Sequence, residues 1–232
     1  MILLNLSVLL LFGSNGSRCN FAVTKTTNRM KKTMQWLYDN WMKATPFLAL
    51  YSFILIWLYV KEQNYALFLI WMQVPIYWFH EFEEYVCPGG FLDFFNRKPL
   101  GSKLGDYPLT KAGSFWINIP LVYILLPLAG IISHFYGIEW GLWTAYFSAL
   151  NAMAHVVMFF IFGFKYNPGL VASTFVNIPF GVYMVWYFLS NNLVSVEVNI
   201  ASIIFGILAQ ASMMIYGFAY LVPKMKREGL KA

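Results

Sequence analysis

Long uninterrupted runs of apolar residues dominate this chain, and they do not show the alternation that is typical of half-buried strands. A helix crosses the hydrocarbon core of a bilayer with about 20 mostly apolar residues. Runs of this kind occur six times, at about residues 44–61, 65–86, 113–134, 139–163, 168–190 and 198–222. A membrane-spanning barrel would instead alternate apolar and polar residues over segments of about ten. We therefore expect an all-α, polytopic helical membrane protein with about six transmembrane helices.

The composition supports this class. Of the 232 residues, 59% are hydrophobic and only 11% are charged, which is typical of helical membrane proteins and not of soluble domains of this size. The formal net charge of +6 comes from basic residues in connections and tails. Such residues orient membrane helices, so we expect membrane lipids as partners and no nucleic acid.

The positions of the basic residues predict the orientation of the spans. Those outside the apolar runs lie mainly before the first run, between the second and third, between the fourth and fifth, and after the sixth: Lys31, Lys32, Lys43, Arg97, Lys98, Lys103, Lys111, Lys165, Lys224, Lys226, Arg227 and Lys231. By the positive-inside rule, both termini are expected on the cytoplasmic side of the cell membrane.

The domain organisation follows from the same pattern. Residues 2–12 are apolar but too short to span a bilayer, and no basic segment precedes them. We interpret residues 1–29 as a non-core extension or a poor signal-like segment, with Met30 or Met34 as the expected start. Residues 30–223 are expected to form one helical membrane domain, and 224–232 a basic cytoplasmic tail.

Candidate chemistry lies at the end of the second apolar run, in the sequence His80-Glu81-Phe82-Glu83-Glu84. Ionisable groups at membrane depth cost about 2.5–3.5 kcal/mol each on insertion scales, so they are rare and usually functional. On a helix, His80, Glu83 and Glu84 share a face, whereas Glu81 is expected to point towards headgroups or water. Neighbouring carboxylates repel each other, and at a helix C-terminus the negative end of the helix dipole disfavours them further. A bound cation would relieve both effects.

The fourth apolar run supplies expected partners for this cluster. Asn151 and His155 are four residues apart and therefore lie on one helix face. The sequence Asn167-Pro168-Gly169 then makes a tight turn before the fifth run. In the expected orientation these polar groups converge towards the cytoplasmic leaflet.

Two imidazoles with carboxylates match the donors that divalent metals prefer. Zinc binds histidine nitrogen and carboxylate oxygen, and iron or manganese accepts the same set. We expect His80, Glu84 and His155 as metal ligands, with zinc favoured. Glu83 is expected to act as general base, and Asn151 as a donor beside the metal or to an oxyanion. The spacing does not distinguish which of the two glutamates takes which role.

The motifs His-x-x-Glu-Glu, Asn-x-x-x-His and Asn-Pro-Gly, spread over about residues 45–180, resemble the HXXEE-domain family of uncharacterised multi-span membrane proteins. The resemblance implies a shared site and names no reaction. A fainter similarity to CAAX-type intramembrane endopeptidases rests on Glu83-Glu84 with later His and Asn residues. The chain departs from their Glu-Glu-x-x-x-Arg pattern, because Pro88 occupies the arginine position.

These observations favour a metal-dependent membrane hydrolase acting on a lipid or lipid-linked substrate near the cytoplasmic leaflet. Two other functions remain open from the sequence: an ion- or proton-coupled transporter that uses the acidic cluster, and a non-catalytic membrane protein. If the protein is non-catalytic, residues 80–84 would be the solvated end of a helix, with Arg97 or Lys98 as ion-pair partners.

Overall fold

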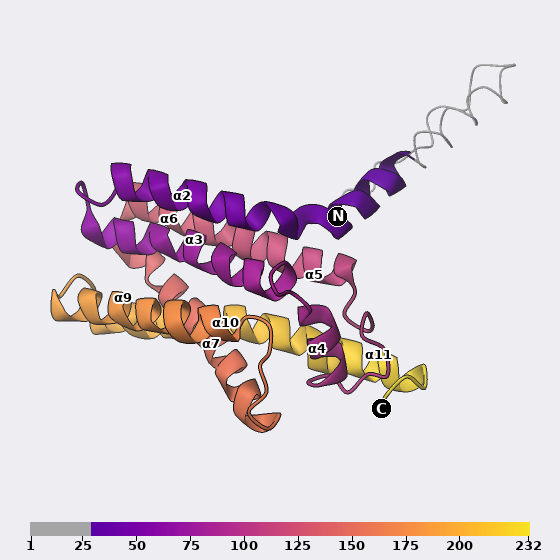
Figure 1. Ribbon diagram of the computed structural model, residues 1–232. Coiled ribbons are helices and arrows are strands. Elements are labelled where there is room, and N and C mark those ends of the chain that lie inside the picture. Colours follow the sequence, from indigo (N-terminus) through magenta and orange to yellow (C-terminus); the bar gives the residue numbers. More distant parts are fainter. Residues whose placement is uncertain (1–28) are drawn as a thin grey trace, which may run out of the picture. The chain divides into compact units, whose positions relative to one another are not determined.

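The computed structural model describes residues 29–232, and the chain divides into two compact units, Met1–Asp39 and Asn40–Ala232. In the first unit the described residues, 29–39, are helical. The interpretation of residues 1–29 as an extension therefore lies outside the described part, except at Arg29. The second unit contains the candidate site and is a bundle of helices (Figure 1).

Helices form the whole framework of the second unit, and no strand occurs among residues 40–232. An isolated antiparallel bridge joins Ser102 to Lys231. The helical elements are a short 3-10 turn Trp41–Ala44, α2 Thr45–Tyr59, α3 Tyr65–Tyr85, α4 Phe91–Arg97, α5 Lys111–Asn118, α6 Leu126–Tyr136, a 3-10 turn Ile138–Gly141, α7 Trp143–Ile161, α8 Leu170–Ala172, α9 Ile178–Ser190, α10 Val196–Ile215 and α11 Val222–Arg227. The π-helical segments Ile119–Leu125, Ser173–Asn177 and Tyr216–Leu221 join α5 to α6, α8 to α9 and α10 to α11.

Each of the six apolar runs forms a helix or a chain of joined helices, so the all-α prediction is confirmed. Five helices of the described chain are long and apolar enough to cross a membrane: Arg29–Tyr59, Lys111–Tyr136, Ile138–Ile161, Leu170–Ser190 and Val196–Arg227. Helix α3 is not among them, because Gln73 and the His80–Glu84 cluster lower its mean hydropathy. The number of six crossings and the cytoplasmic termini remain predictions.

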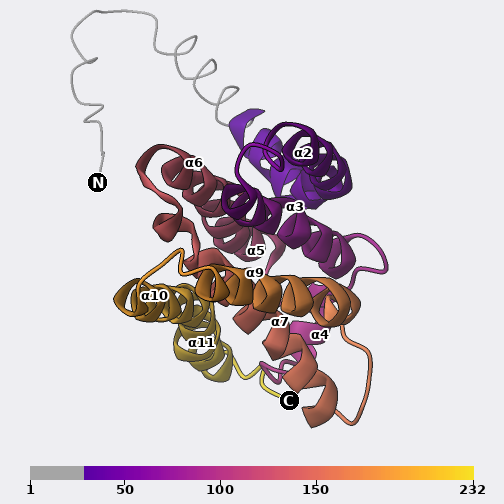
Figure 2. The same ribbon diagram turned by 90° about the vertical axis from the view of Figure 1, so that its left-hand side faces the viewer.

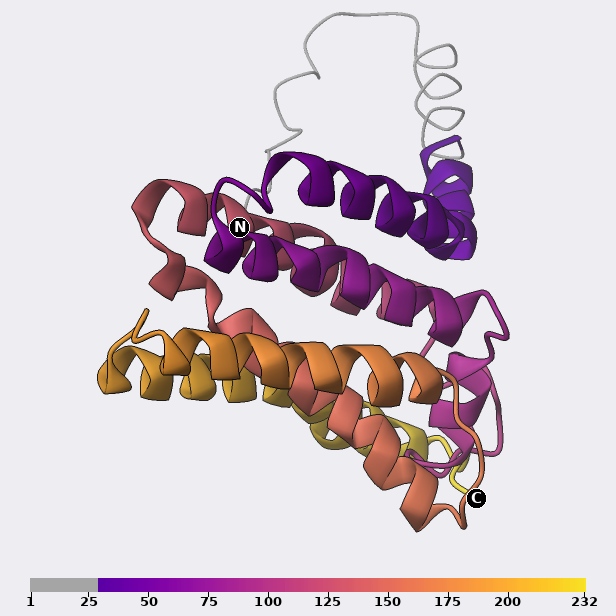
Figure 3. The same ribbon diagram turned by 60° about the vertical axis from the view of Figure 1, so that its left-hand side comes forward.

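Helix α3 is the central helix of the bundle. It contacts α2, α6, α7 and α9, and Figures 2 and 3 show it between α2 and α9. Most of its 21 residues are buried, including Gln73, His80 and the three glutamates. Neighbouring helices therefore shield these polar groups from lipid, which explains why a helix of this composition is tolerated in an apolar bundle.

Local sequence signals set the ends of α3. The side chain of Asn64 caps its start by accepting a hydrogen bond from the backbone N–H of Leu67 at 2.9 Å. The helix ends at Tyr85, and Pro88 and Gly89 follow, with Gly89 at φ +74°. The polar cluster is thus fixed in the last turn and a half of the helix.

An aromatic stack sets the alignment of α3 against α7. The rings of Tyr77 and Phe147 are nearly parallel, with centroids 5.3 Å apart and an interplanar angle of 9°. One helical turn onward along each chain, His80 faces Asn151. Packing of the apolar core therefore places the two polar faces against each other.

The connection between α3 and α5 folds around Asn96, which is buried in α4. Its Nδ2 donates to the carbonyls of Gly105 and Leu109, at 2.9 Å each, and its Oδ1 accepts from the N–H of Leu109 at 2.8 Å. The C-terminal tail lies along the same connection, since the N–H of Lys103 donates to Leu230 O at 3.0 Å. A single side chain thus organises the loop that covers this end of the bundle.

Candidate metal site

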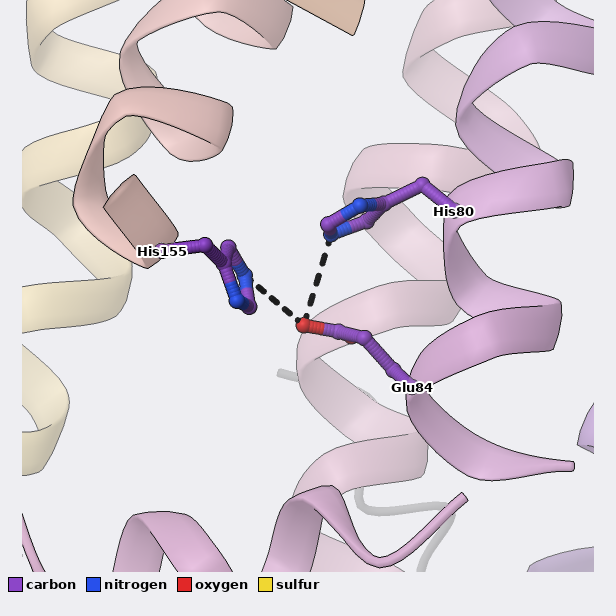
Figure 4. Close-up of side chains that lie close together, drawn as sticks. All are labelled: His80, Glu84 and His155. Atoms are coloured by element: carbon purple, nitrogen blue, oxygen red, sulfur yellow. Dashed lines mark ion pairs between the residues drawn. The ribbon is translucent and has the colours of Figure 1, made fainter. Parts of the chain in front are cut away.

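Three expected ligands meet in the interior of the bundle. His80 and Glu84 project from successive turns of α3, and His155 projects from α7 towards them (Figure 4). Glu84 Oε1 lies 3.4 Å from His80 Nε2 and 3.1 Å from His155 Nε2. All three side chains are buried, and one donor atom of each lies within 4.8 Å of the others. The arrangement can hold a metal ion.

Hydrogen bonds from Asn167 determine which nitrogen of His155 is free. Asn167 Nδ2 donates to the backbone carbonyl of His155 at 3.0 Å, so its Oδ1 is the atom that faces His155 Nδ1, at 2.8 Å. An amide oxygen only accepts, and Nδ1 must therefore carry the proton. In neutral His155 the lone pair is then on Nε2, the nitrogen that faces Glu84.

This tautomer places two acceptors against each other. An unprotonated imidazole nitrogen and a carboxylate oxygen repel at 3.1 Å unless a proton or a metal cation lies between them. Donors around a tetrahedral zinc, with bonds of about 2.0–2.1 Å, are about 3.3–3.4 Å apart. The separations of 3.1 and 3.4 Å from Glu84 fit that spacing, and the three donor atoms together lie within 4.8 Å of one another. The residues present therefore fit a divalent metal with imidazole and carboxylate ligands.

Two polar neighbours lie beside His80, and only Ser173 could hold it once Nε2 binds a metal. Asn151 Nδ2 lies 3.3 Å from His80 Nε2, and Ser173 Oγ lies 3.4 Å from His80 Nδ1. A metal-binding histidine is commonly oriented through its second nitrogen, and Ser173 occupies that position here. Both predicted polar residues of α7, Asn151 and His155, thus lie beside the α3 cluster.

The backbone of Gly169 packs against the imidazole rings of His80 and His155. It has φ +96°, a conformation that residues with a side chain rarely adopt. A Cβ atom there would lie 2.7 Å from His155 Cε1 and 2.8 Å from His80 Cε1. The Asn-Pro-Gly turn therefore serves two purposes: Asn167 orients His155, and Gly169 lets the backbone approach both rings.

Glu83 points to a different part of the molecule from Glu84. Its Oε1 accepts from Tyr166 Oη at 2.9 Å and from the N–H of Val171 at 3.0 Å, and its Oε2 accepts from the N–H of Ala172 at 2.6 Å. Burial, together with the bond to Glu83, raises the pKa of Tyr166, so its phenol remains a donor. Glu83 thus ties α3 to the first turn of the Leu170–Ser190 helix, where free N–H groups favour a carboxylate.

The structure contradicts the expectation that Glu81 points towards headgroups or water. Its side chain is 1% exposed and does not reach headgroups or water. It lines a cavity of about 60 Å³ together with Glu84, Asn118, Asn151 and His155. The prediction was wrong because α3 is surrounded by helices at this end, so the face opposite Glu83 is also buried.

The interpretation of this cluster as a solvated helix end is also wrong. His80, Glu81, Glu83 and Glu84 are all buried. Arg97, one of the expected ion-pair partners, binds Asp93 on its own helix at 2.7 Å.

Sequence reasoning missed four contributors to the site: Asn167, Gly169, Tyr166 and Ser173. The Asn-Pro-Gly turn was recognised as a turn, but its contacts with His155 and His80 were not. The Gly of that turn was the available signal, because a backbone that passes close to side chains requires glycine. Tyr166 and Ser173 carry no distinguishing pattern in the sequence.

Comparison with known proteins finds a family model that matches the part of the chain around the site. Residues 71–184 match the family model described as "Protein of unknown function with HXXEE motif", which confirms the resemblance to the HXXEE family. The match includes the three clustered residues and the Asn-Pro-Gly turn. Searches of curated proteins and of solved structures gave no match.

Proposed function

We propose that this HXXEE-domain protein is a metal-dependent membrane hydrolase whose ligands are His80, Glu84 and His155. One observation carries the proposal: the free nitrogen of His155 faces a carboxylate oxygen at 3.1 Å, in a buried group with metal-ligand spacing. Zinc is the favoured ion, and iron or manganese would accept the same donors. A divalent ion at such a site supplies Lewis acidity and activates water near neutral pH.

The cavity beside the ligands supports a reaction with water. At about 10–15 Å³ per water, the cavity of about 60 Å³ accommodates a few water molecules. Glu84 and His155 are among its lining residues, so a substrate group in the cavity would lie next to them.

We assign the surrounding residues by their contacts. Asn151 lies against both His80 and the cavity, which suits a donor to a developing oxyanion. The catalytic roles of Glu83 and Asn151 remain predictions. For Glu83, three hydrogen bonds from residues 166–172 favour a positioning role over proton transfer.

The membrane setting determines the substrate class in this proposal. Five helices have the length and composition to cross a membrane, and the lining of the cavity is largely apolar beyond its polar end. Lipids or lipid-linked molecules are the substrates that reach such a site from a bilayer. In the orientation that the basic residues predict, the site lies towards the cytoplasmic leaflet.

The metal content of the purified protein tests the proposal. Protein prepared without chelators is measured by inductively coupled plasma mass spectrometry beside a His80→Ala/His155→Ala variant and a His134→Ala control, whose imidazole is exposed. We expect near-stoichiometric zinc, iron or manganese in wild type and control and little in the double variant. A panel of fluorogenic acyl lipids then tests hydrolysis. Absence of metal from the wild type, or hydrolysis that persists in the double variant, would overturn the proposal.

A further inference from the structure

Glu81 contributes a buried carboxyl group that the metal site does not use. Its Oε2 atom is buried and has no hydrogen-bond partner. An unpaired polar atom in a protein interior costs about 1–3 kcal/mol, so its retention at this place calls for an explanation. The side chain lines the same cavity as Glu84 and His155.

Two hydrogen-bond donors of the cavity wall, Ser114 and Asn118, bind Tyr85 and not Glu81. Ser114 Oγ donates to Tyr85 Oη at 2.9 Å, and Asn118 Nδ2 donates to the same oxygen at 3.2 Å. All three residues line the cavity with Glu81. The carboxyl group of Glu81 is thus an acceptor without a partner at the polar end of the cavity, and a ligand that pairs with it must bring a donor.

The remaining wall selects against charged headgroups of anionic lipids. Among residues 29–232, which the structure describes, no lysine or arginine lines this cavity. The opposite side is apolar and comes from α4 and α10, through Phe91, Phe95, Met213 and Met214. A phosphate group would meet carboxyls and no cation, whereas an alkyl chain would contact aromatic rings and thioethers.

We infer that Glu81 is the recognition residue of this cavity, and that the ligand is an uncharged molecule with an apolar chain ending in an N–H or O–H donor. A fatty amide and a fatty alcohol share this chemistry. The inference rests on the proposed function only in taking the cavity as the substrate pocket. It names the class of ligand: a fatty amide would be a substrate for hydrolysis, and a fatty alcohol would be a product. The donor binds the carboxyl group of Glu81 in the cavity, and the chain extends from the cavity against α4 and α10.

Ligand pairs that differ in one donor test this inference by equilibrium binding. The purified full-length protein is titrated with hexanamide and N,N-dimethylhexanamide, and with hexanol and methyl hexyl ether, by isothermal titration calorimetry in one detergent. We expect wild type to bind the donor of at least one pair about 2- to 10-fold more tightly than its blocked partner, as for a typical net hydrogen bond. The two pairs also distinguish an amide ligand from an alcohol ligand.

Two variants at residue 81 separate hydrogen bonding from shape. Glu81→Gln keeps an acceptor oxygen and should retain a preference for the donor ligand, whereas Glu81→Leu keeps the volume and should abolish it. Metal content is measured for each, and we expect it to equal that of wild type. Equal binding of both members of each pair by wild type, or an unchanged preference in Glu81→Leu, would overturn the inference. Loss of the preference with metal retained supports it, whether or not hydrolysis of lipids is found.

Discussion

Asn167 binds His155 twice, through the backbone carbonyl at 3.0 Å and through Nδ1 at 2.8 Å. This pairing fixes the orientation of the imidazole and directs Nε2, the nitrogen that Asn167 does not bind, at Glu84. Partners of this kind are a general feature of metal-binding histidines, and their loss typically costs 10–100-fold in metal affinity. The relationship joins the Asn-Pro-Gly turn to the chemistry of the site.

Replacement of Asn167 should therefore weaken metal binding without removing a ligand. We expect Asn167→Ala to lower metal affinity by about 10–100-fold, measured by competition with a chromophoric chelator. Asn191→Ala is the matched control, because Asn191 is exposed and bonds only locally at the end of α9. Equal affinities for both variants would contradict this role of Asn167.

Gly169→Ala should disrupt the site by steric contact with the imidazole rings. A control glycine separates this contact from the cost of the positive φ angle. The new Cβ would lie under 3 Å from both imidazole rings, in a backbone conformation that itself costs about 1–3 kcal/mol for other residues. Gly163 is the matched control, since it has φ +79° and a Cβ added there would meet no atom within 4 Å. We expect both alanine variants to lose stability and only Gly169→Ala to lose metal. Retention of metal by Gly169→Ala would contradict the close packing of the turn on the rings.

Glu83 and Glu84 should give different results when each is replaced. Glu84→Gln removes a ligand and should abolish metal binding. Glu83→Ala leaves the N–H groups of Val171 and Ala172 and the Tyr166 phenol without their partner, so we expect a loss of stability of about 1–3 kcal/mol with metal retained. Thermal unfolding and metal content of the two variants check this. If Glu83→Gln keeps wild-type stability and metal but loses lipid hydrolysis, the general-base role is favoured instead.

Asn96→Ala should loosen the connection between α3 and α5. The substitution removes three hydrogen bonds of 2.8–2.9 Å in a buried position, and we expect a loss of about 2–4 kcal/mol, from about 1 kcal/mol for each neutral hydrogen bond plus the groups left unpaired. Limited proteolysis should show faster cleavage between residues 98 and 110. Unchanged cleavage would mean that contacts with the C-terminal tail suffice to hold this loop.

The sequence by itself determined the class of the fold and pointed to His80, Glu84 and His155, which the structure brings together. Bilayer thickness imposes apolar runs of a fixed length, so the six runs could be located to within a few residues. Helical periodicity placed His80 with Glu84 and Asn151 with His155, because both pairs are local. Membrane crossing by α3 is not determined by this pattern, since the polar cluster that marks the site lowers the mean hydropathy of this helix. The side of the membrane on which the termini lie also remains a prediction.

Only the tertiary structure decided what surrounds each polar group. Glu81 was expected to face water, but helices surround α3 at this end and bury it beside a cavity. Glu83 and Glu84 are adjacent in sequence, yet one binds the start of the Leu170–Ser190 helix and the other faces two imidazoles. Asn167 and Gly169 acquire their roles through contacts with residues far away along the chain. Helical periodicity gives the direction of a side chain on its own helix, and the partner in that direction depends on how the helices pack.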